Sequence, residues 1–309
     1  MINRELIRQK VVQHIYAYYA NEGKDLESAE KEFVFSLSKS YELYLTLLQL
    51  MVSINYIARR TVEMKMNRAQ RLGDKDYISP KFVNNRFIAQ LKANKTLQNF
   101  TEKQNVIWTE EEEDFLRRTY ERITEQDFYK KYMRSGITTY EEDREIWRMI
   151  YRQILIDNDE LDEILEDHSI YWNDDKAIID TFVLKTIRRF EENKWGDQPL
   201  LPEFKDSEDR NFALVLFRTT IQNEEYYRQL IRDQTLNWDI ERIAMMDLVI
   251  MQVALAELTS FPEIPLSVTI NEYVEVAKFY STPRSGSYIN GIIDTIAKRL
   301  IAEGKIEEK

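Results

Sequence analysis

Helix-breaking residues are scarce in this chain. Its 309 residues include only 7 glycines and 6 prolines. Strands need frequent turns, and turns draw on these two residue types, so such a chain favours long helices. Apolar residues also recur at helical spacing, as at Leu47, Met51 and Ile54. The sequence therefore predicts an all-α fold.

The same periodicity places the individual helices. The first is expected over residues 2–19 and the second over residues 33–57. Thr109 and Glu112 have the spacing of a capping box, which predicts a helix running toward Tyr120. Further helices are expected near residues 141–156, 159–168, 173–192, 207–221, 223–233, 239–259, 266–280 and 286–302. The Trp-Gly-Asp-Gln-Pro-Leu-Leu-Pro segment at 195–202 predicts a linker.

Composition narrows the class of protein. The chain has no cysteine, which excludes disulfides and thiolate metal sites and fits a reducing compartment. The opening residues contain no apolar run suited to a signal peptide, and no stretch is apolar for long enough to span a membrane. We therefore expect a cytoplasmic protein. A net charge of −11 argues against indiscriminate coating of nucleic acid.

The charge is nevertheless unevenly distributed. Residues 59–103 hold eleven Lys and Arg against four Asp and Glu, whereas residues 157–180 hold ten acids against one lysine. Both runs are compatible with solvated helix faces. The basic run is also compatible with contact to RNA, or with neutralisation of the acidic run inside the molecule.

Four short motifs stand out. Residues 12–16 read Val-Gln-His-Ile-Tyr. Residues 247–258 read Asp-Leu-Val-Ile-Met-Gln-Val-Ala-Leu-Ala-Glu-Leu, in which Leu248, Met251, Leu255 and Leu258 predict one core-facing stripe. Residues 270–278 read Ile-Asn-Glu-Tyr-Val-Glu-Val-Ala-Lys, and residues 288–293 read Tyr-Ile-Asn-Gly-Ile-Ile.

In this order and spacing the motifs resemble the NusB family of transcription antitermination factors. The resemblance implies a NusB-type helical bundle divided in the sequence. Residues 1–20 would supply its first helix, residues 205–309 the rest of the RNA-binding core, and residues 25–200 a helical insertion. It also implies an adaptor that recognises boxA-type single-stranded nascent RNA together with a small-subunit ribosomal protein, and meets the RNA polymerase complex indirectly.

The resemblance further implies which residues make these contacts. The first helix and the entry to the last helix would form the RNA surface, and Tyr16 and Asp247 would face the protein partner. Basic residues would neutralise phosphates, Gln13 would read a base edge, and Tyr16 or Tyr288 would stack on an unpaired base. The expected RNA-binding residues are Arg4, Arg8, Lys10, Gln13, Arg284, Ser285, Ser287, Tyr288 and Asn290.

Catalysis is not expected. His14 and His168 are the only histidines, and neither has a carboxylate pair at metal-ligand spacing beside it. No glycine-rich phosphate loop is present, so we expect no cofactor and no metal. The alternative to the RNA adaptor is a helical protein-interaction scaffold with weak or no RNA binding.

Overall fold

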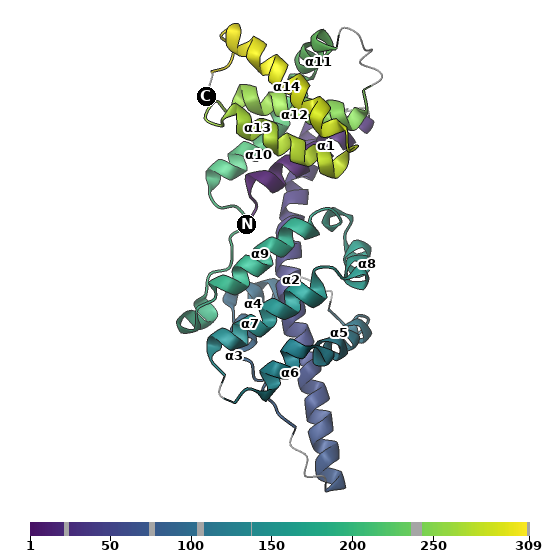
Figure 1. The fold of residues 1–309 in the computed structure, drawn as a ribbon, viewed down its shortest axis with the longest axis vertical. Helices are drawn as coiled ribbons and strands as arrows, with labels where there is room; N and C mark the ends of the chain where they lie inside the picture. Colours follow the sequence, from purple (N-terminus) through teal and green to yellow (C-terminus); the bar gives the residue numbers. More distant parts are fainter. Residues whose placement is uncertain (22–24, 74–77, 104–107, 137, 236–242, 308–309) are drawn as a thin grey trace. The chain divides into compact units, whose positions relative to one another are not determined.

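The computed structural model describes residues 1–21, 25–73, 78–103, 108–136, 138–235 and 243–307. The chain divides into two compact units (Figure 1). Unit 1 comprises residues 1–38 and 203–309, and unit 2 comprises residues 39–202. The regular elements of the described residues are helices. Ile2 and Phe204 form one isolated parallel β-bridge. The prediction of an all-α fold is confirmed.

Unit 1 is built around one buried helix. It contains α1 (Arg4–Ala20), the start of α2 (Leu26–Leu72), α10 (Ser207–Gln222), α11 (Glu224–Gln234), α12 (Met245–Ser260), α13 (Leu266–Tyr280) and α14 (Ser285–Ala302). Helix α12 packs against α1, α10, α11, α13 and α14. Every residue from Asp247 to Leu258 is buried. The expectation of a single core-facing stripe on this helix was therefore too narrow, because a helix surrounded by five others needs apolar side chains on all sides.

The start of the chain is fixed to its C-terminal part. The Asn3 side chain caps α1 by accepting a hydrogen bond from the amide of Leu6 at 3.0 Å. The amide of Ile2 donates to the carbonyl of Glu203 at 2.7 Å. Ile2 itself is buried. The N-terminus is thus held beside the segment through which the chain re-enters unit 1.

Unit 2 contains the remainder of α2 and a set of shorter helices. These are α3 (Arg86–Lys92), α4 (Lys95–Lys103), α5 (Glu113–Glu125), α6 (Asp127–Arg134), α7 (Tyr140–Ile150), α8 (Asp159–His168) and α9 (Lys176–Arg189). A π-helical turn, Tyr151–Leu155, continues α7, and 3-10 turns span Ile170–Trp172 and Glu192–Asp197. Aromatic rings fill much of the core: Phe82 lies 5.2 Å from Trp147 and 6.0 Å from Tyr120 between ring centroids.

Two helix boundaries differ from the sequence-based expectation. Helix α2 extends well beyond the expected 33–57. Ala58, Val62, Met66 and Ala69 continue the helical spacing, a signal that the expectation did not use. Thr109 and Glu112 do hydrogen-bond to each other, at 2.7 Å, yet α5 begins only at Glu113. The capping box that the structure contains is Thr139 with Glu142, which opens α7.

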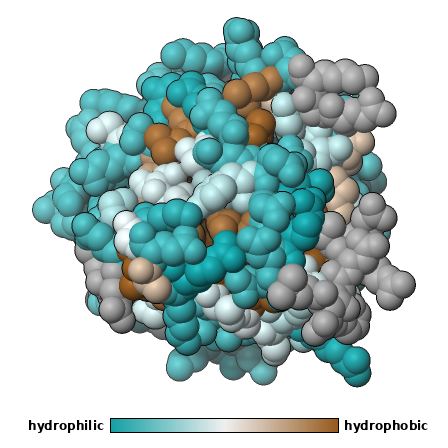
Figure 2. Space-filling model, turned by 90° about the horizontal axis from the view of Figure 1, so that it is seen from above, coloured by the Kyte–Doolittle hydropathy of each residue, from teal (hydrophilic) through white to brown (hydrophobic). Residues whose placement is uncertain are grey.

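None of the described helices is long and apolar enough to cross a membrane. The face shown in Figure 2 is mostly hydrophilic, and its hydrophobic areas are separated by hydrophilic side chains.

Candidate functional site

A buried ion pair joins α1 to α12. The Arg8 guanidinium contacts both carboxylate oxygens of Glu257, with Nε–Oε2 and Nη2–Oε1 distances of 2.8 and 2.9 Å. Its Nη1 reaches Glu272 on α13 at 3.0 Å. The Arg8 residue is 4% exposed and Glu257 is 0% exposed. Bidentate geometry of this kind gives a strong charge-assisted contact.

The Glu257 carboxylate is further satisfied by hydroxyl groups. Thr269 Oγ1 and Tyr273 Oη each donate to it at 2.9 Å. Burial by itself lowers the pKa of Arg8, but the hydrogen bond and charge of Glu257 outweigh it and raise the pKa above its ordinary value. The Arg8 side chain is therefore a permanent cation inside the unit. Its place in an internal ion pair removes it from the expected phosphate contacts.

Two other basic residues of α1 differ in accessibility. The Arg4 guanidinium lies 4.9 Å from the centroid of the Phe212 ring and 3.4 Å from the Asp209 carboxylate, with its side chain 33% exposed. Lys10 is 2% exposed. Three basic residues of α1 were expected to contact phosphate. Arg4 is partly exposed, whereas Arg8 and Lys10 are buried.

Asp247 occupies the junction between α12 and the loop before α14. It is 8% exposed, and its carboxylate accepts hydrogen bonds from Ser285 at 2.9 Å and from Ser281 at 2.5 Å. The Ser285 hydroxyl is also within 2.9 Å of Thr282. These contacts fix the entry to α14. Because both groups are used inside the unit, we do not retain Asp247 as a partner contact or Ser285 as a phosphate contact.

Gln13 connects α1 to the end of α13. Its Nε2 donates to Tyr280 Oη at 2.8 Å. Tyr280 is the last residue of α13, directly before the loop that leads into α14. The structure thus brings the middle of α1 beside the end of α13, next to the loop that enters the last helix.

One face of α14 is left at the surface. Arg284, Ser287, Tyr288 and Gly291 are exposed and follow helical spacing, and Asn290 is exposed at the edge of this face. We call these five residues the α14 face. Tyr288 is 38% exposed, and partial burial together with the charge of Asp247 raises its pKa. A Cβ added to Gly291 would meet no atom within 4 Å, so packing does not require this glycine.

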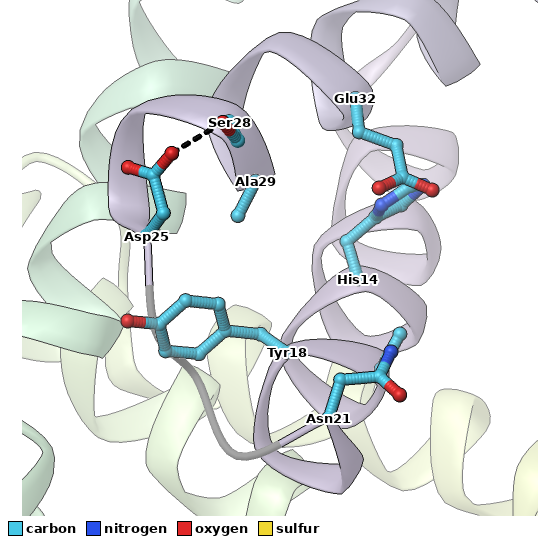
Figure 3. A pocket seen from close by; sticks show the side chains of 8 residues that line it. His14, Tyr18, Asn21, Asp25, Ser28, Ala29 and Glu32 are labelled. Atoms are coloured by element: carbon cyan, nitrogen blue, oxygen red, sulfur yellow. Dashed lines mark hydrogen bonds between the residues drawn. The ribbon is translucent and has the colours of Figure 1, made fainter.

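A small pocket lies where α1 meets the first turns of α2. Its volume is about 220 Å3, and it is lined by His14, Ala17, Tyr18, Asn21, Asp25, Ser28, Ala29 and Glu32 (Figure 3). The Asp25 carboxylate accepts a hydrogen bond from Ser28. Burial lowers the pKa of His14 to about 4, and its ring makes an edge contact with Phe33 at 5.7 Å. His14 is therefore a neutral packed side chain near neutral pH.

The sequence contains one feature that points to the internal ion pair of Arg8, although Arg8 was expected at the RNA surface. Glu257 stands within an otherwise apolar stretch of α12, and a charge in a buried helix needs a partner. Arg8 is the basic residue that α1 supplies to it. Among the residues that the structure describes, no group of histidine and acidic side chains could hold a metal ion.

The part of the chain that contains the motifs at 247–258, 270–278 and 288–293 matches a known protein family. The NusB family model matches residues 181–298. The transcription antitermination protein NusB of Salinibacter ruber is 40% identical over 108 residues, covering 35% of this chain and 68% of that protein. The proteins of the same name from Thermodesulfovibrio yellowstonii and Geotalea daltonii are 36% and 37% identical, covering 80% and 88% of their own lengths. A solved structure of T. maritima NusB aligns at 30% identity with a TM-score of 0.31, over 40% of this chain and 87% of that one. The chain belongs to the NusB family.

Proposed function

We propose that this chain is a transcription antitermination factor that binds boxA-type single-stranded nascent RNA together with a small-subunit ribosomal protein. It would act in the cytoplasm as an adaptor rather than an enzyme, and would reach RNA polymerase through the assembled complex. Two relatives that are 40% and 36% identical carry the name transcription antitermination protein NusB. We further propose that unit 1 is the NusB core and that unit 2 is a helical insertion into it.

The α14 face carries the proposal. Arg284 offers a cation, Ser287 and Asn290 offer hydrogen bonds, and Tyr288 offers an exposed ring. These groups lie in the first two turns of a helix, where the amide groups and the macrodipole favour a phosphate. Unpaired bases commonly stack on tyrosine, and phosphates pair with arginine.

Gly291 is a second feature that supports ligand binding at the α14 face. A glycine within an exposed helix costs about 0.5–1 kcal/mol relative to alanine. No neighbouring atom in the unit requires its absence of a side chain. A close approach by the backbone or base of a ligand would require it, which makes the glycine consistent with a binding face.

The revised set of contacts is smaller than the sequence suggested. Arg284, Ser287, Tyr288 and Asn290 remain as RNA contacts. Arg4 and Gln13 remain at its edge, since both are partly buried and hydrogen-bonded. Tyr16 is 36% exposed and remains the proposed contact to the ribosomal protein.

The test is binding of labelled boxA-type RNA and a scrambled strand, with and without the ribosomal protein. Tyr288→Ala should cost about 1–3 kcal/mol of binding free energy, whereas Tyr288→Phe keeps the ring and should bind nearly as the wild type does. Arg284→Gln should reduce the slope of log K against log salt concentration by about 0.7. Lys298→Gln is the control, since Lys298 is exposed on the same helix roughly 10 Å beyond Gly291 and pairs with Asp294.

Equal binding of both RNAs by all of these proteins would contradict the proposal. It would favour the alternative, a helical interaction scaffold.

A further inference from the structure

The C-terminal end of α2 projects beyond the rest of unit 2. Every residue from Glu63 to Leu72 is exposed except Ala69, which is half-buried. Figure 1 shows this end of α2 extending past the other helices of its unit. Met64 is 62% exposed and Leu72 is 71% exposed. An isolated helix this short is marginal in water, so its continuity with the buried part of α2 holds it in place.

This projecting end is basic. Lys65, Arg68 and Arg71 stand against the single acid Glu63, and no ion pair joins the three cations to any residue that the structure describes. Other cations of the basic run 59–103 are used internally. Arg86 pairs with Asp143 and Glu192, Lys95 pairs with Asp197, and Lys81 donates to the Ser135 carbonyl. The basic run thus contains two groups of cations. One group has partners within the molecule, and the cations of the projecting end pair with no residue the structure describes.

A groove in unit 2 lies next to the projecting end along α2. Its volume is about 770 Å3, within the range of roughly 300–1,000 Å3 that is usual for ligand pockets. Its walls are mainly apolar, and its lining includes Tyr56, Arg59, Arg60, Lys92, Glu110 and Glu113.

The groove presents one aromatic ring to solvent. Tyr56 is 57% exposed, and the Arg60 guanidinium lies 5.9 Å from its ring centroid. Glu113 holds that guanidinium at 2.8 Å. Arg59 is oriented by the Val83 carbonyl at 2.6 Å. The ring and the two cations are therefore positioned by the protein itself.

A single stripe joins the groove to the projecting end. Tyr56, Arg60, Met64 and Arg68 are spaced four residues apart, and Arg71 follows three residues later. Residues at these spacings share one face of a helix. The stripe extends over about 22 Å at 1.5 Å per residue. It offers an aromatic platform at one end and, at the other, cations that form no ion pair with any residue the structure describes. Single-stranded nucleic acid requires this combination.

We propose that this groove and stripe bind single-stranded RNA. A base would stack on Tyr56 at the groove, and Arg68 and Arg71 would contact phosphates along the stripe. Among the described residues that line the groove or form the projecting end, six are cations and three are acids: Arg59, Arg60, Lys65, Arg68, Arg71 and Lys92 against Glu63, Glu110 and Glu113. The choice of RNA over another polyanion rests on the proposed function of the chain. The surface itself belongs to unit 2 and is separate from the α14 face.

The experiment compares two RNAs on the full chain. One is a short boxA-type RNA, and the other extends it with a mixed-sequence single-stranded tail. Arg68→Gln/Arg71→Gln should reduce the salt slope for the extended RNA by about 1.4, twice the single-strand value per contact. Tyr56→Ala should weaken binding of the extended RNA by roughly 5- to 150-fold, and Tyr56→Phe should not. Binding of the short RNA should be unchanged in all three variants.

The controls separate this proposal from the proposed function. Arg152→Gln/Lys185→Gln makes the same charge change at exposed positions elsewhere in unit 2, and should leave binding of both RNAs unchanged. Photocrosslinking of 4-thiouridine in the tail should label the peptide that contains Tyr56.

Each outcome has one meaning. Wild-type affinity for the extended RNA in both the Tyr56→Ala and the Arg68→Gln/Arg71→Gln proteins overturns the RNA track and points to a protein partner for the projecting end. Loss of that affinity, combined with unchanged short-RNA binding in the Tyr288→Ala protein, supports the track and counts against the α14 face. Failure of the wild type to bind either RNA overturns both proposals.

Discussion

Replacing Arg8 with methionine would leave a buried carboxylate without its cation. Methionine fills a similar path along the helix, so the change removes the charge and its hydrogen bonds while keeping apolar contact. Glu257 would retain only the hydroxyl groups of Thr269 and Tyr273. Breaking a buried pair by removing one partner costs about 3–5 kcal/mol. Against a typical total stability of about 5–15 kcal/mol, this would be a large loss.

The loss should be confined to unit 1. Four of the five tryptophans lie in the sequence of unit 2, so tryptophan fluorescence during urea unfolding mainly reports that unit. Circular dichroism reports helices in both units. We expect Arg8→Met to shift the circular-dichroism transition more than the fluorescence transition. Hydrogen exchange should accelerate in the peptides of α1 and α12 and remain unchanged in those of α7.

Two companion variants sharpen this test. Arg4 lies on the same helix as Arg8, and both guanidinium groups lie near the Phe212 ring. The ion pair of Arg4 is partly exposed, so Arg4→Met should cost less than about 1 kcal/mol of stability. Arg8→Met/Glu257→Met replaces the whole pair with apolar groups and should recover much of the lost stability. An Arg8→Met protein with wild-type stability and weakened RNA binding would refute the internal role and return Arg8 to the phosphate contacts.

Three further predictions follow from single positions. Gly196→Ala would place a Cβ 2.6 Å from the Ala93 carbonyl oxygen and should destabilise unit 2 by about 1–3 kcal/mol in urea unfolding, whereas Gly136→Ala, with open space at its Cβ, should change little. Burial lowers the pKa of His14 from 6.5 to about 4, so the stability it contributes is fully present above pH 6.5 and is lost as the pH falls toward 4. Unfolding measured at about pH 7 and about pH 4.5 should show a smaller acid loss, by up to about 3 kcal/mol, in His14→Gln than in the wild type. Gly291→Ala should raise stability by about 0.5–1 kcal/mol and weaken RNA binding, and unchanged binding would count against close approach at this site.

Helix positions were largely readable from sequence because apolar periodicity is a local property. The expected helices over 159–168, 207–221 and 266–280 agree closely with α8, α10 and α13. The ends of α2 were not readable. Val62, Met66 and Ala69 continue the helical spacing, but the last ten residues are nearly all exposed, so no packing against the described residues marks where the helix ends.

The candidate site was harder to predict because exposure is set by partners distant in sequence. Arg8, Lys10 and Arg284 look alike as basic residues near expected helices. Arg8 is buried in an ion pair with Glu257, 249 positions away, whereas Arg284 is exposed. Asp247 and Ser285 satisfy each other across 38 positions, which removes two expected contacts at once. Apart from the charge of Glu257 in the apolar stretch of α12, residue type and local spacing do not indicate these pairings.

The way the chain leaves and re-enters unit 1 bears on the proposal that unit 2 is a helical insertion. Helix α2 continues from unit 1 into unit 2 without a break, and the return point at Glu203 is held by the amide of Ile2. The return point is thus fixed by a contact within unit 1, and the point of departure lies inside a continuous helix. The entropic cost of a closed loop grows only slowly with its length, so an insert with its own core adds little further cost. Removing the Ile2 contact should therefore loosen the return segment first. We expect deletion of residues 1–2 to accelerate hydrogen exchange at residues 203–206 while exchange in α7 of unit 2 stays unchanged, and equal acceleration in both would contradict this account.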